Sequence, residues 1–529
     1  MSYFTSLGGL FMKHALILLA AVGSAAYAQT ACEQLQSLKL PDTTITMVTT
    51  VPAGAFVNPA PPPAPQADAI DPPPAVPAGG RGGAAQTPQM LPAYCRVLAT
   101  LKPSADSDIK IEVWLPIGAA WNGKYEAVGG GGWAGVISYP ALANAVQEGY
   151  ATSSTDTGHE GGNAKFAVGH PEKIVDFSYR AVHEMVVKAK AVMTTFYGRG
   201  PRLSYWNGCS TGGRQGLMEA QRYPEDFDGI VAGAPANFQT HLHAYDIVVQ
   251  TAVRQPGAAV PPAKIEMLSK AVMAACDASD GVKDGLLNNP RKCNFDYASL
   301  LCKGADANDC LTAAQVESVK KAHGPVKNSK GELVYPGYAQ GGEGTWRVLS
   351  AANGPSPTAL SLGTYREVLH QDSNWDWKKF DVDKDVPAVD EKYGYINAVS
   401  PDLSAFKARG GKLIQYHGWN DTAISPENSI NYYSSVLGKM GSKQDNWYRL
   451  FMVPGMAHCG NGPGPNQFNY MGAMERWRES NVAPDQMTAS HVANNRVDMT
   501  RPLCPFPQVA TYKGVGSTND AANFSCKAQ

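Results

Sequence analysis

The sequence predicts an α/β fold in which a mostly parallel sheet is covered by helices on both faces. Strand-length apolar runs alternate along the chain with stretches of helical periodicity, which is the pattern of such a fold. One of these runs, 203–207, leads into a Gly-Cys-Ser-Thr-Gly turn at 208–212, after which a helical pattern begins. With 529 residues, the chain is long enough for several average domains or for one large α/β domain carrying a sizeable insertion.

The individual elements follow from periodicity and from residue type. Strands are predicted where β-branched and aromatic residues gather, and helices where apolar residues recur every three or four positions. The predicted strands are 95–101, 109–115, 124–128, 203–207, 412–416 and 448–453, and the predicted helices are 176–196 and 213–223. The strand at 124–128 runs directly into four consecutive glycines, Gly129–Gly132.

The N-terminus has the layout of an export signal. Lys13 and His14 form a short polar region, an apolar run follows at 15–21, and Ala26-Tyr27-Ala28 is typical of a cleavage site. The apolar run is too short to span a bilayer, so residues 1–28 are predicted to be a signal peptide and the protein to be secreted or periplasmic. The net charge of −1, with Lys and Arg scattered along the chain, points away from nucleic acid and membranes and toward a small-molecule partner.

Ten cysteines in an exported chain predict five disulfides. A zinc site is the alternative, but no paired C-x-x-C spacing supports it. Proximity in the sequence suggests the pairs Cys32–Cys95, Cys276–Cys293, Cys302–Cys310 and Cys504–Cys526. Cys209 and Cys459 remain, far apart in the sequence.

Ser210 is the predicted nucleophile. It occupies the centre of Gly208-Cys209-Ser210-Thr211-Gly212, which fits the G-x-S-x-G elbow that turns sharply from a strand into a helix. In such a turn the N–H of Thr211 would face the developing oxyanion. The alternative is a plain glycine-rich turn whose serine caps the helix.

His458 and Asp421 are the predicted base and acid, because this kind of fold places the acid and then the histidine after the serine. Each follows a predicted strand, in a loop where its side chain can reach the serine turn. The carboxylate of Asp421 would orient the imidazole and stabilise its protonated form. His417 is a weaker candidate for the base and a better one for a substrate-pocket residue.

The two remaining cysteines adjoin these residues. Cys209 precedes Ser210 and Cys459 follows His458. A disulfide between them would tie the two catalytic loops together.

These motifs resemble the tannase and feruloyl esterase family. The matching segments are 208–215, 418–421, Gly455-Met456 with His458-Cys459, 91–95, 121–124 and 133–135. The resemblance implies an α/β-hydrolase core, 29–237 and 399–529, with a lid domain, 238–398, inserted between nucleophile and acid. In secreted members of the family, a disulfide joins the cysteines beside the serine and the histidine.

The lid would also hold a calcium ion. Asp277, Asp280 and Asp284 lie at spacings of three and four residues with glycines between them, a set of hard oxygen donors suited to Ca²⁺. The spacing is not that of an EF-hand, and a solvated acidic turn is the alternative. The resemblance implies a structural calcium site with those three carboxylates and the backbone carbonyls of Val282 and Leu286, closed by Cys276–Cys293.

The predicted reaction is a two-step acyl transfer through an acyl-enzyme on Ser210. The oxyanion would rest on the N–H groups of Thr211 and of one glycine in 129–132, for which Gly132 is chosen. The resemblance implies esters of aromatic, hydroxycinnamic-type acids; Tyr365, Trp375 and Trp377 would serve as lid core more readily than as substrate contacts. Galloyl esters and mono(2-hydroxyethyl) terephthalate are alternative substrates, and a serine peptidase or an inactive binding protein of the same fold are alternative functions.

Overall fold

The computed structural model describes residues 1, 29–59, 88–346 and 356–528, so the predicted signal segment lies almost wholly outside it. The helices are α1 (Tyr139–Gln147), α2 (Pro171–Val175), α3 (Ala181–Tyr197), α4 (Thr211–Arg222), α5 (Gln239–Val253), α6 (Pro262–Cys276), α7 (Ala313–His323), α8 (Ala359–Gly363), α9 (Val382–Tyr393), α10 (Ser404–Ala408), α11 (Pro426–Met440) and α12 (Tyr470–Ser480). The strands are β1 (Thr43–Val51), β2 (Gly54–Ala55), β3 (Met90–Leu91), β4 (Tyr94–Leu101), β5 (Ile109–Pro116), β6 (Lys124–Val128), β7 (Ala151–Thr155), β8 (Leu203–Cys209), β9 (Gly229–Gly233), β10 (Val326–Lys327), β11 (Leu333–Tyr335), β12 (Lys412–Gly418), β13 (Tyr448–Val453), β14 (Met487–Ala493), β15 (Arg496–Leu503), β16 (Gln508–Tyr512) and β17 (Phe524–Ala528).

A nine-stranded sheet organises the fold, in the order β1-β4-β5-β7-β6-β8-β9-β12-β13. The strands from β7 to β13 are parallel, as predicted, whereas β1, β4 and β5 pair antiparallel at one edge. The predicted strands and helices are present, with ends shifted by at most a few residues. No strand was predicted at β7 because its sequence, ATSST, is polar, although the strand is fully buried between β5 and β6.

Residues in the parallel strands alternate between two cores. Leu413 of β12 packs with α3, α4 and α11 on one face, while the next residue, Ile414, packs with α12 on the other. Ile230 and Val231 of β9 divide in the same way. Because both faces are covered, these strands are buried along almost their whole length, as expected for a buried parallel sheet.

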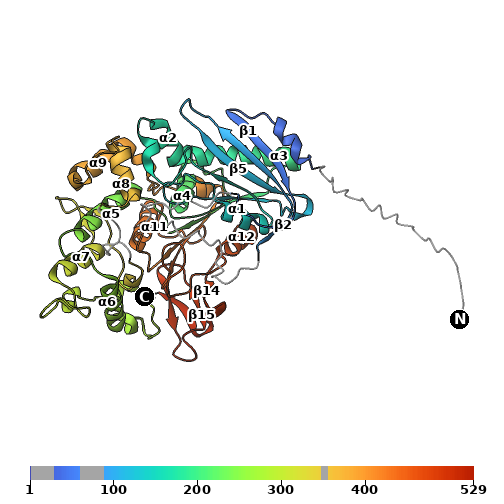
Figure 1. Ribbon diagram of the computed structural model, residues 1–529. Coiled ribbons are helices and arrows are strands. Elements are labelled where there is room, and N and C mark those ends of the chain that lie inside the picture. Colours follow the sequence, from blue (N-terminus) through green and yellow to red (C-terminus); the bar gives the residue numbers. More distant parts are fainter. Residues whose placement is uncertain (2–28, 60–87, 347–355, 529) are drawn as a thin grey trace.

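A long, mainly helical segment is inserted at the middle of the sheet. The chain leaves after β9 and returns as β12, which pairs directly with β9. Helices α5 to α9 lie between these two strands, and Figure 1 shows them gathered at the opposite side of the molecule from β1 and β5. They enclose their own hydrophobic cluster, which also takes in Trp133 and Phe177 from the sheet-bearing part.

The C-terminal 40 or so residues form two separate hairpins, β14–β15 and β16–β17, beside α12. Cys504–Cys526 ties the second hairpin to the end of the first. Within the described ranges, no helix combines the length and hydropathy needed to cross a bilayer.

Candidate active site

Ser210 occupies a sharp turn between β8 and α4. Its backbone has φ 63° and ψ −122°, a conformation rarely adopted by residues with a side chain. The Ser210 N–H donates to Gly233 O at 3.0 Å, which fixes the turn against the end of β9. This is the geometry of a nucleophile elbow, in which the strained backbone presents the serine side chain at the carboxyl ends of the parallel strands.

Asp421 lies in the loop that follows β12 and is almost completely buried. Its Oδ1 accepts hydrogen bonds from the N–H groups of Ala423 (2.8 Å) and Ile424 (2.9 Å). Its Oδ2 lies 2.8 Å from Nδ1 of His458, in the loop after β13. The structure therefore brings the predicted acid and base together, with the carboxylate held by the backbone of its own loop.

The contact changes the acidity of both groups. Burial favours the neutral carboxyl of Asp421, but the charge of His458 and hydrogen bonds from two histidines outweigh it, so the pKa is well below its usual range. Burial also lowers the pKa of His458, yet the charge and hydrogen bond of Asp421 raise it above its ordinary value overall. An ionised acid beside an imidazole of raised basicity is the arrangement that a general base requires.

His417 does not line a substrate pocket, and we correct that prediction. Its side chain is completely buried. Nδ1 lies 2.7 Å from Ser429 Oγ, and Nε2 lies 3.0 Å from Asp421 Oδ2 and 3.1 Å from Ile424 O. Since Ile424 O can only accept, Nε2 carries the proton and Nδ1 accepts from the Ser429 hydroxyl. His417 is thus a second donor to the buried acid.

All five predicted disulfides are present in the structure. Cys209–Cys459 joins the last residue of β8 to the loop after β13 and brings the two Cα atoms to 5.9 Å. Cys459 has φ 61°. The loop that carries His458 therefore contains a strained residue, as the serine turn does at Ser210. The bond holds the residues next to each cysteine, Ser210 and His458, on adjoining loops.

The glycine-rich loop after β6 packs against the start of α4. A Cβ atom on Gly129 would come within 2.5 Å of the Gly212 Cα, so only glycine allows this approach. Thr211 Oγ1 donates to Gly132 O at 2.6 Å, and Gly130 N–H donates to Gln215 Oε1 at 3.1 Å. The two predicted oxyanion residues are therefore neighbours. Gln215 belongs to the motif beside Ser210, but its role in holding this loop was not predicted.

Trp133 and Leu360 connect this loop to the inserted segment. Trp133 is fully buried, and its Nε1–H donates to Leu360 O at 3.1 Å. The Leu360 side chain is 41% exposed, and its Cδ1 would lie 3.8 Å from a Cβ on Gly132. An exposed apolar side chain from α8 thus lies directly beside the predicted oxyanion glycine.

The three aromatic residues named from the sequence pack within the inserted segment, with Tyr365 buried and Trp375 and Trp377 half-buried. Tyr365 is fully buried, and its hydroxyl donates to Thr240 O at 2.8 Å. Trp375 stacks on His370 with ring centroids 4.4 Å apart, and both Trp375 and Trp377 pack at the edge of the lid cluster. These positions agree with a role in lid packing.

The acidic loop after α6 gathers its three carboxylates with a single buried cation. Asp277 accepts from the N–H of Gly285 at 2.9 Å, and Asp280 accepts from the N–H of Asn288 at 2.8 Å. Asp284 pairs with Arg501 at 2.7 Å, and both side chains are at most 1% exposed. Three carboxylates and one guanidinium leave two negative charges, which a divalent cation would balance.

The same loop shows the electrostatic effect of that excess charge. Burial, opposed by hydrogen bonds to the loop, raises the pKa of Asp280. Burial likewise raises the pKa of Asp284, and the neighbouring carboxylates add to it despite Arg501. Val282 and Leu286 bury their side chains, and their N–H groups donate to Asp280 and Asp284. The donor set therefore fits a hard cation.

Comparisons with known proteins agree with this geometry. The family model "Tannase and feruloyl esterase" matches residues 95–527. An uncharacterized esterase of Xanthomonas campestris pv. campestris is 37% identical, covering 96% of this chain and 93% of its own length. A protein of Aspergillus clavatus named "Probable feruloyl esterase B" is 34% identical, covering 97% and 99%.

A solved structure extends the likeness to three dimensions. The crystal structure of feruloyl esterase B from Aspergillus oryzae is 31% identical, covers 94% of this chain and 99% of that one, and has a TM-score of 0.84. That likeness, with the nine-stranded sheet and the serine elbow, gives the core an α/β-hydrolase fold. By family match, sequence identity and fold, the chain belongs to the tannase and feruloyl esterase family and is a carboxylic-ester hydrolase.

Proposed function

We propose that the protein is a secreted serine esterase that hydrolyses esters of aromatic acids through Ser210, His458 and Asp421. The observation that carries the proposal is the 2.8 Å contact between Asp421 and His458, on a loop that a disulfide ties to the strained serine turn. In the described part of the chain, two histidines contact the fully buried Asp421 carboxylate near that turn, His458 and His417. His417 is buried behind the acid, which leaves His458 as the base.

In the first step His458 takes the proton of Ser210 Oγ as the oxygen attacks the ester carbonyl. The N–H groups of Thr211 and Gly132 stabilise the oxyanion, and His458 then protonates the leaving alcohol. In the second step His458 activates water, which attacks the acyl-enzyme and releases the acid and Ser210. Asp421 stays ionised and stabilises the imidazolium formed in both steps.

The substrate class rests on family membership and on the apolar surface beside the site. Leu360 offers an aromatic acyl group an apolar contact next to Gly132, and relatives in this family are named feruloyl esterases. Hydroxycinnamic esters are therefore the first choice. Galloyl esters are the second, because the family description also names tannase.

Calcium and export complete the proposal. A structural Ca²⁺ would be held by Asp277, Asp280 and Asp284 with the carbonyls of Val282 and Leu286, and would supply the positive charge that the loop lacks. Five disulfides suit an oxidising compartment, and the first 28 residues have the composition of a signal peptide.

A substrate panel tests the proposal directly. Rates with methyl ferulate, methyl gallate and mono(2-hydroxyethyl) terephthalate are compared as kcat/KM for wild type and Ser210→Ala. We expect the highest kcat/KM for methyl ferulate and a loss of about 10⁴-fold or more in the variant. Equal rates for the two proteins would refute the serine mechanism; a preference for methyl gallate would change only the acyl group.

A further inference from the structure

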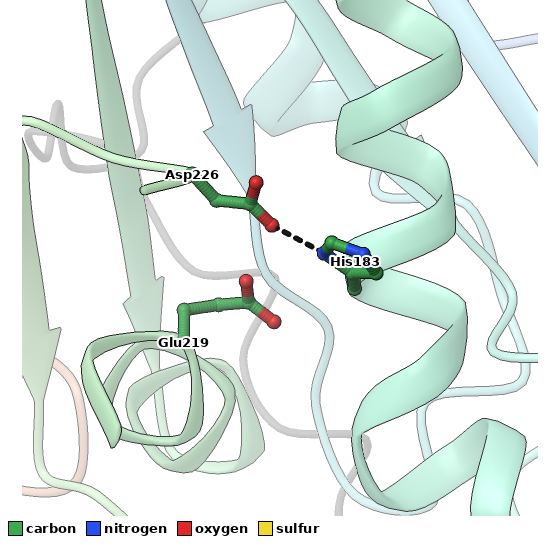
Figure 2. A group of neighbouring side chains, drawn as sticks. All are labelled: His183, Glu219 and Asp226. Atoms are coloured by element: carbon green, nitrogen blue, oxygen red, sulfur yellow. Dashed lines mark hydrogen bonds and ion pairs between the residues drawn. The ribbon is translucent and has the colours of Figure 1, made fainter. Parts of the chain in front are cut away.

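A second cluster of titratable side chains lies far from the triad, where α3, α4 and the loop before β9 meet. It consists of His183, Glu219 and Asp226, and one donor atom from each lies within 4.8 Å of the others. Figure 2 shows the two carboxylates and the imidazole directed toward a common space, each from a different segment. Glu219 is nine residues beyond Ser210 on α4, about 13 Å along the helix axis, so the cluster is separate from the triad.

Glu219 is the unusual member. It is only 1% exposed, and among the described residues neither carboxylate oxygen accepts a hydrogen bond from an N–H or hydroxyl donor; its polar neighbour is the Asp226 carboxyl. A buried carboxylate without a donor is costly unless a cation or a proton occupies the space that it faces.

The other two members, Asp226 and His183, supply further ligand atoms for a cation. Asp226 is 4% exposed, and its Oδ2 lies 2.7 Å from Nδ1 of His183. The His183 side chain is 24% exposed and stacks on Tyr223, with ring centroids 3.8 Å apart, so the ring is held in place with one part of it facing solvent. Lys190 is the closest cation: its Nζ donates to the backbone carbonyl of Asp226 at 2.5 Å.

The charges favour a cation. Two carboxylates and one ammonium leave a net negative charge when the imidazole is neutral. Lys190 contacts the backbone carbonyl of Asp226, whereas both Glu219 oxygens have no bonded donor. The deficit of positive charge therefore lies at the space between the three side chains.

We propose that His183, Glu219 and Asp226 bind one zinc ion. Imidazole nitrogen and carboxylate oxygen are both ligand types that Zn²⁺ accepts, and water from the exposed side of His183 would complete four-coordination. Ca²⁺ is a poor match because it takes six to eight oxygen ligands. Zinc takes the place of the hydrogen bond between His183 Nδ1 and Asp226 Oδ2, so the ring stays neutral with its one proton on Nε2. Any second ring proton, and any proton held by the two carboxylates, is released to solvent. The ion would clamp α3 to α4 and to the loop before β9.

Zinc binding to untagged protein tests this site. The protein is treated with EDTA and dialysed into calcium, which refills the proposed lid site, and is then equilibrated with Zn²⁺. Bound zinc is counted by mass spectrometry for wild type, Glu219→Gln, His183→Asn and His170→Asn. His170 is the matched control, since it pairs with Asp106 at 2.7 Å on the exposed surface without a second carboxylate.

We expect wild type and His170→Asn to bind one more zinc ion per chain than Glu219→Gln and His183→Asn. Esterase activity should be the same in Glu219→Gln as in wild type, because glutamine keeps the buried shape and the triad is intact; this activity also reports folding. Zinc should raise the Tm of wild type and leave that of Glu219→Gln unchanged. The proposal is overturned if wild type binds no zinc beyond Glu219→Gln, in which case the carboxyl pair holds only a proton.

Discussion

Cys209 and Cys459 are 250 residues apart in the sequence, and their disulfide brings the two Cα atoms to 5.9 Å. One cysteine precedes the proposed nucleophile and the other follows the proposed base. The bond therefore joins the loops whose separation decides whether His458 can reach Ser210. Each of these loops contains a residue with positive φ, Ser210 in one and Cys459 in the other, so each has an unusual backbone conformation that the disulfide helps to hold.

The first prediction concerns this tether. Replacing both cysteines, as Cys209→Ala with Cys459→Ala, should lower kcat by about 10- to 100-fold with a smaller effect on KM, because the base is no longer held at the serine. Steady-state kinetics on an aromatic ester measure both constants, and circular dichroism verifies that the variant is folded.

The control is the pair Cys302→Ala with Cys310→Ala. That disulfide closes a loop of only eight residues within the inserted segment, away from the triad. It should leave kcat near the wild-type value. Equal losses of kcat in the two double variants would contradict a specific tethering role.

The second prediction concerns pH. His458 must be neutral to accept the serine proton, and Asp421 raises its pKa above the ordinary value of 6.5. The kcat/KM of the wild type should therefore fall as the pH decreases through a midpoint above 6.5, where the imidazole becomes protonated. A pH–rate profile with a neutral ester gives this midpoint directly.

Asp421→Asn supplies the matched comparison for that profile. Without the carboxylate, burial remains and lowers the pKa of His458, so the acidic limb should move to lower pH. The plateau rate should fall by about 10⁴-fold, because asparagine does not stabilise the correct tautomer and the imidazolium. An acidic limb at the same pH in both proteins would show that His458 is not the titrating base.

His417 illustrates which features of the site can be predicted from sequence. The elbow, the acid and the base are visible because each has a short local pattern after a strand. The contact of His417 with Asp421 and Ser429 depends on how the loop after β12 folds back onto α11, which no local pattern encodes. Residue pattern likewise predicted six of the nine strands of the sheet and missed β1, β7 and β9; the buried but polar sequence of β7 has no apolar signal. The same limit hid Glu219 and Asp226, which meet His183 only through tertiary packing.

The third prediction follows from that contact. His417→Ala should lower kcat by about tenfold and destabilise the fold by about 1–3 kcal/mol, because Asp421 loses a buried donor. Ser429→Ala removes only the hydroxyl that orients His417 and should have a smaller effect of the same kind. Kinetics and thermal unfolding measure the two effects. A variant with wild-type kcat would show that His417 does not help to position the acid.

The fourth prediction concerns the proposed calcium site. Asp280→Asn should lower Tm and remove the further decrease that EDTA causes in wild type, while kcat at low temperature stays near normal. The reason is that the loop would already lack its ion. Asp309→Asn, at an exposed aspartate of the same segment, is the control and should retain the wild-type response to EDTA. A wild-type Tm that does not respond to EDTA would contradict the site.

The last prediction tests whether catalysis depends on the backbone conformation of Gly132 rather than on the space around it. Gly132 has φ 57°, and the nearest atom to an added Cβ would be Leu360 Cδ1 at 3.8 Å, so alanine fits but is strained. Gly132→Ala should cost about 1–2 kcal/mol of stability. Because the strain falls on the N–H proposed to stabilise the oxyanion, kcat should also fall by roughly 10- to 100-fold with little change in KM.

Gly331→Ala provides the comparison that isolates this effect. Gly331 has φ 81° with no atom within 4 Å of an added Cβ, and it lies in the exposed turn between β10 and β11. The same backbone strain should therefore lower stability by a similar amount without changing kcat. If both variants keep the wild-type kcat, a change in the Gly132 backbone does not affect the transition state. The second oxyanion donor is then another group of the loop.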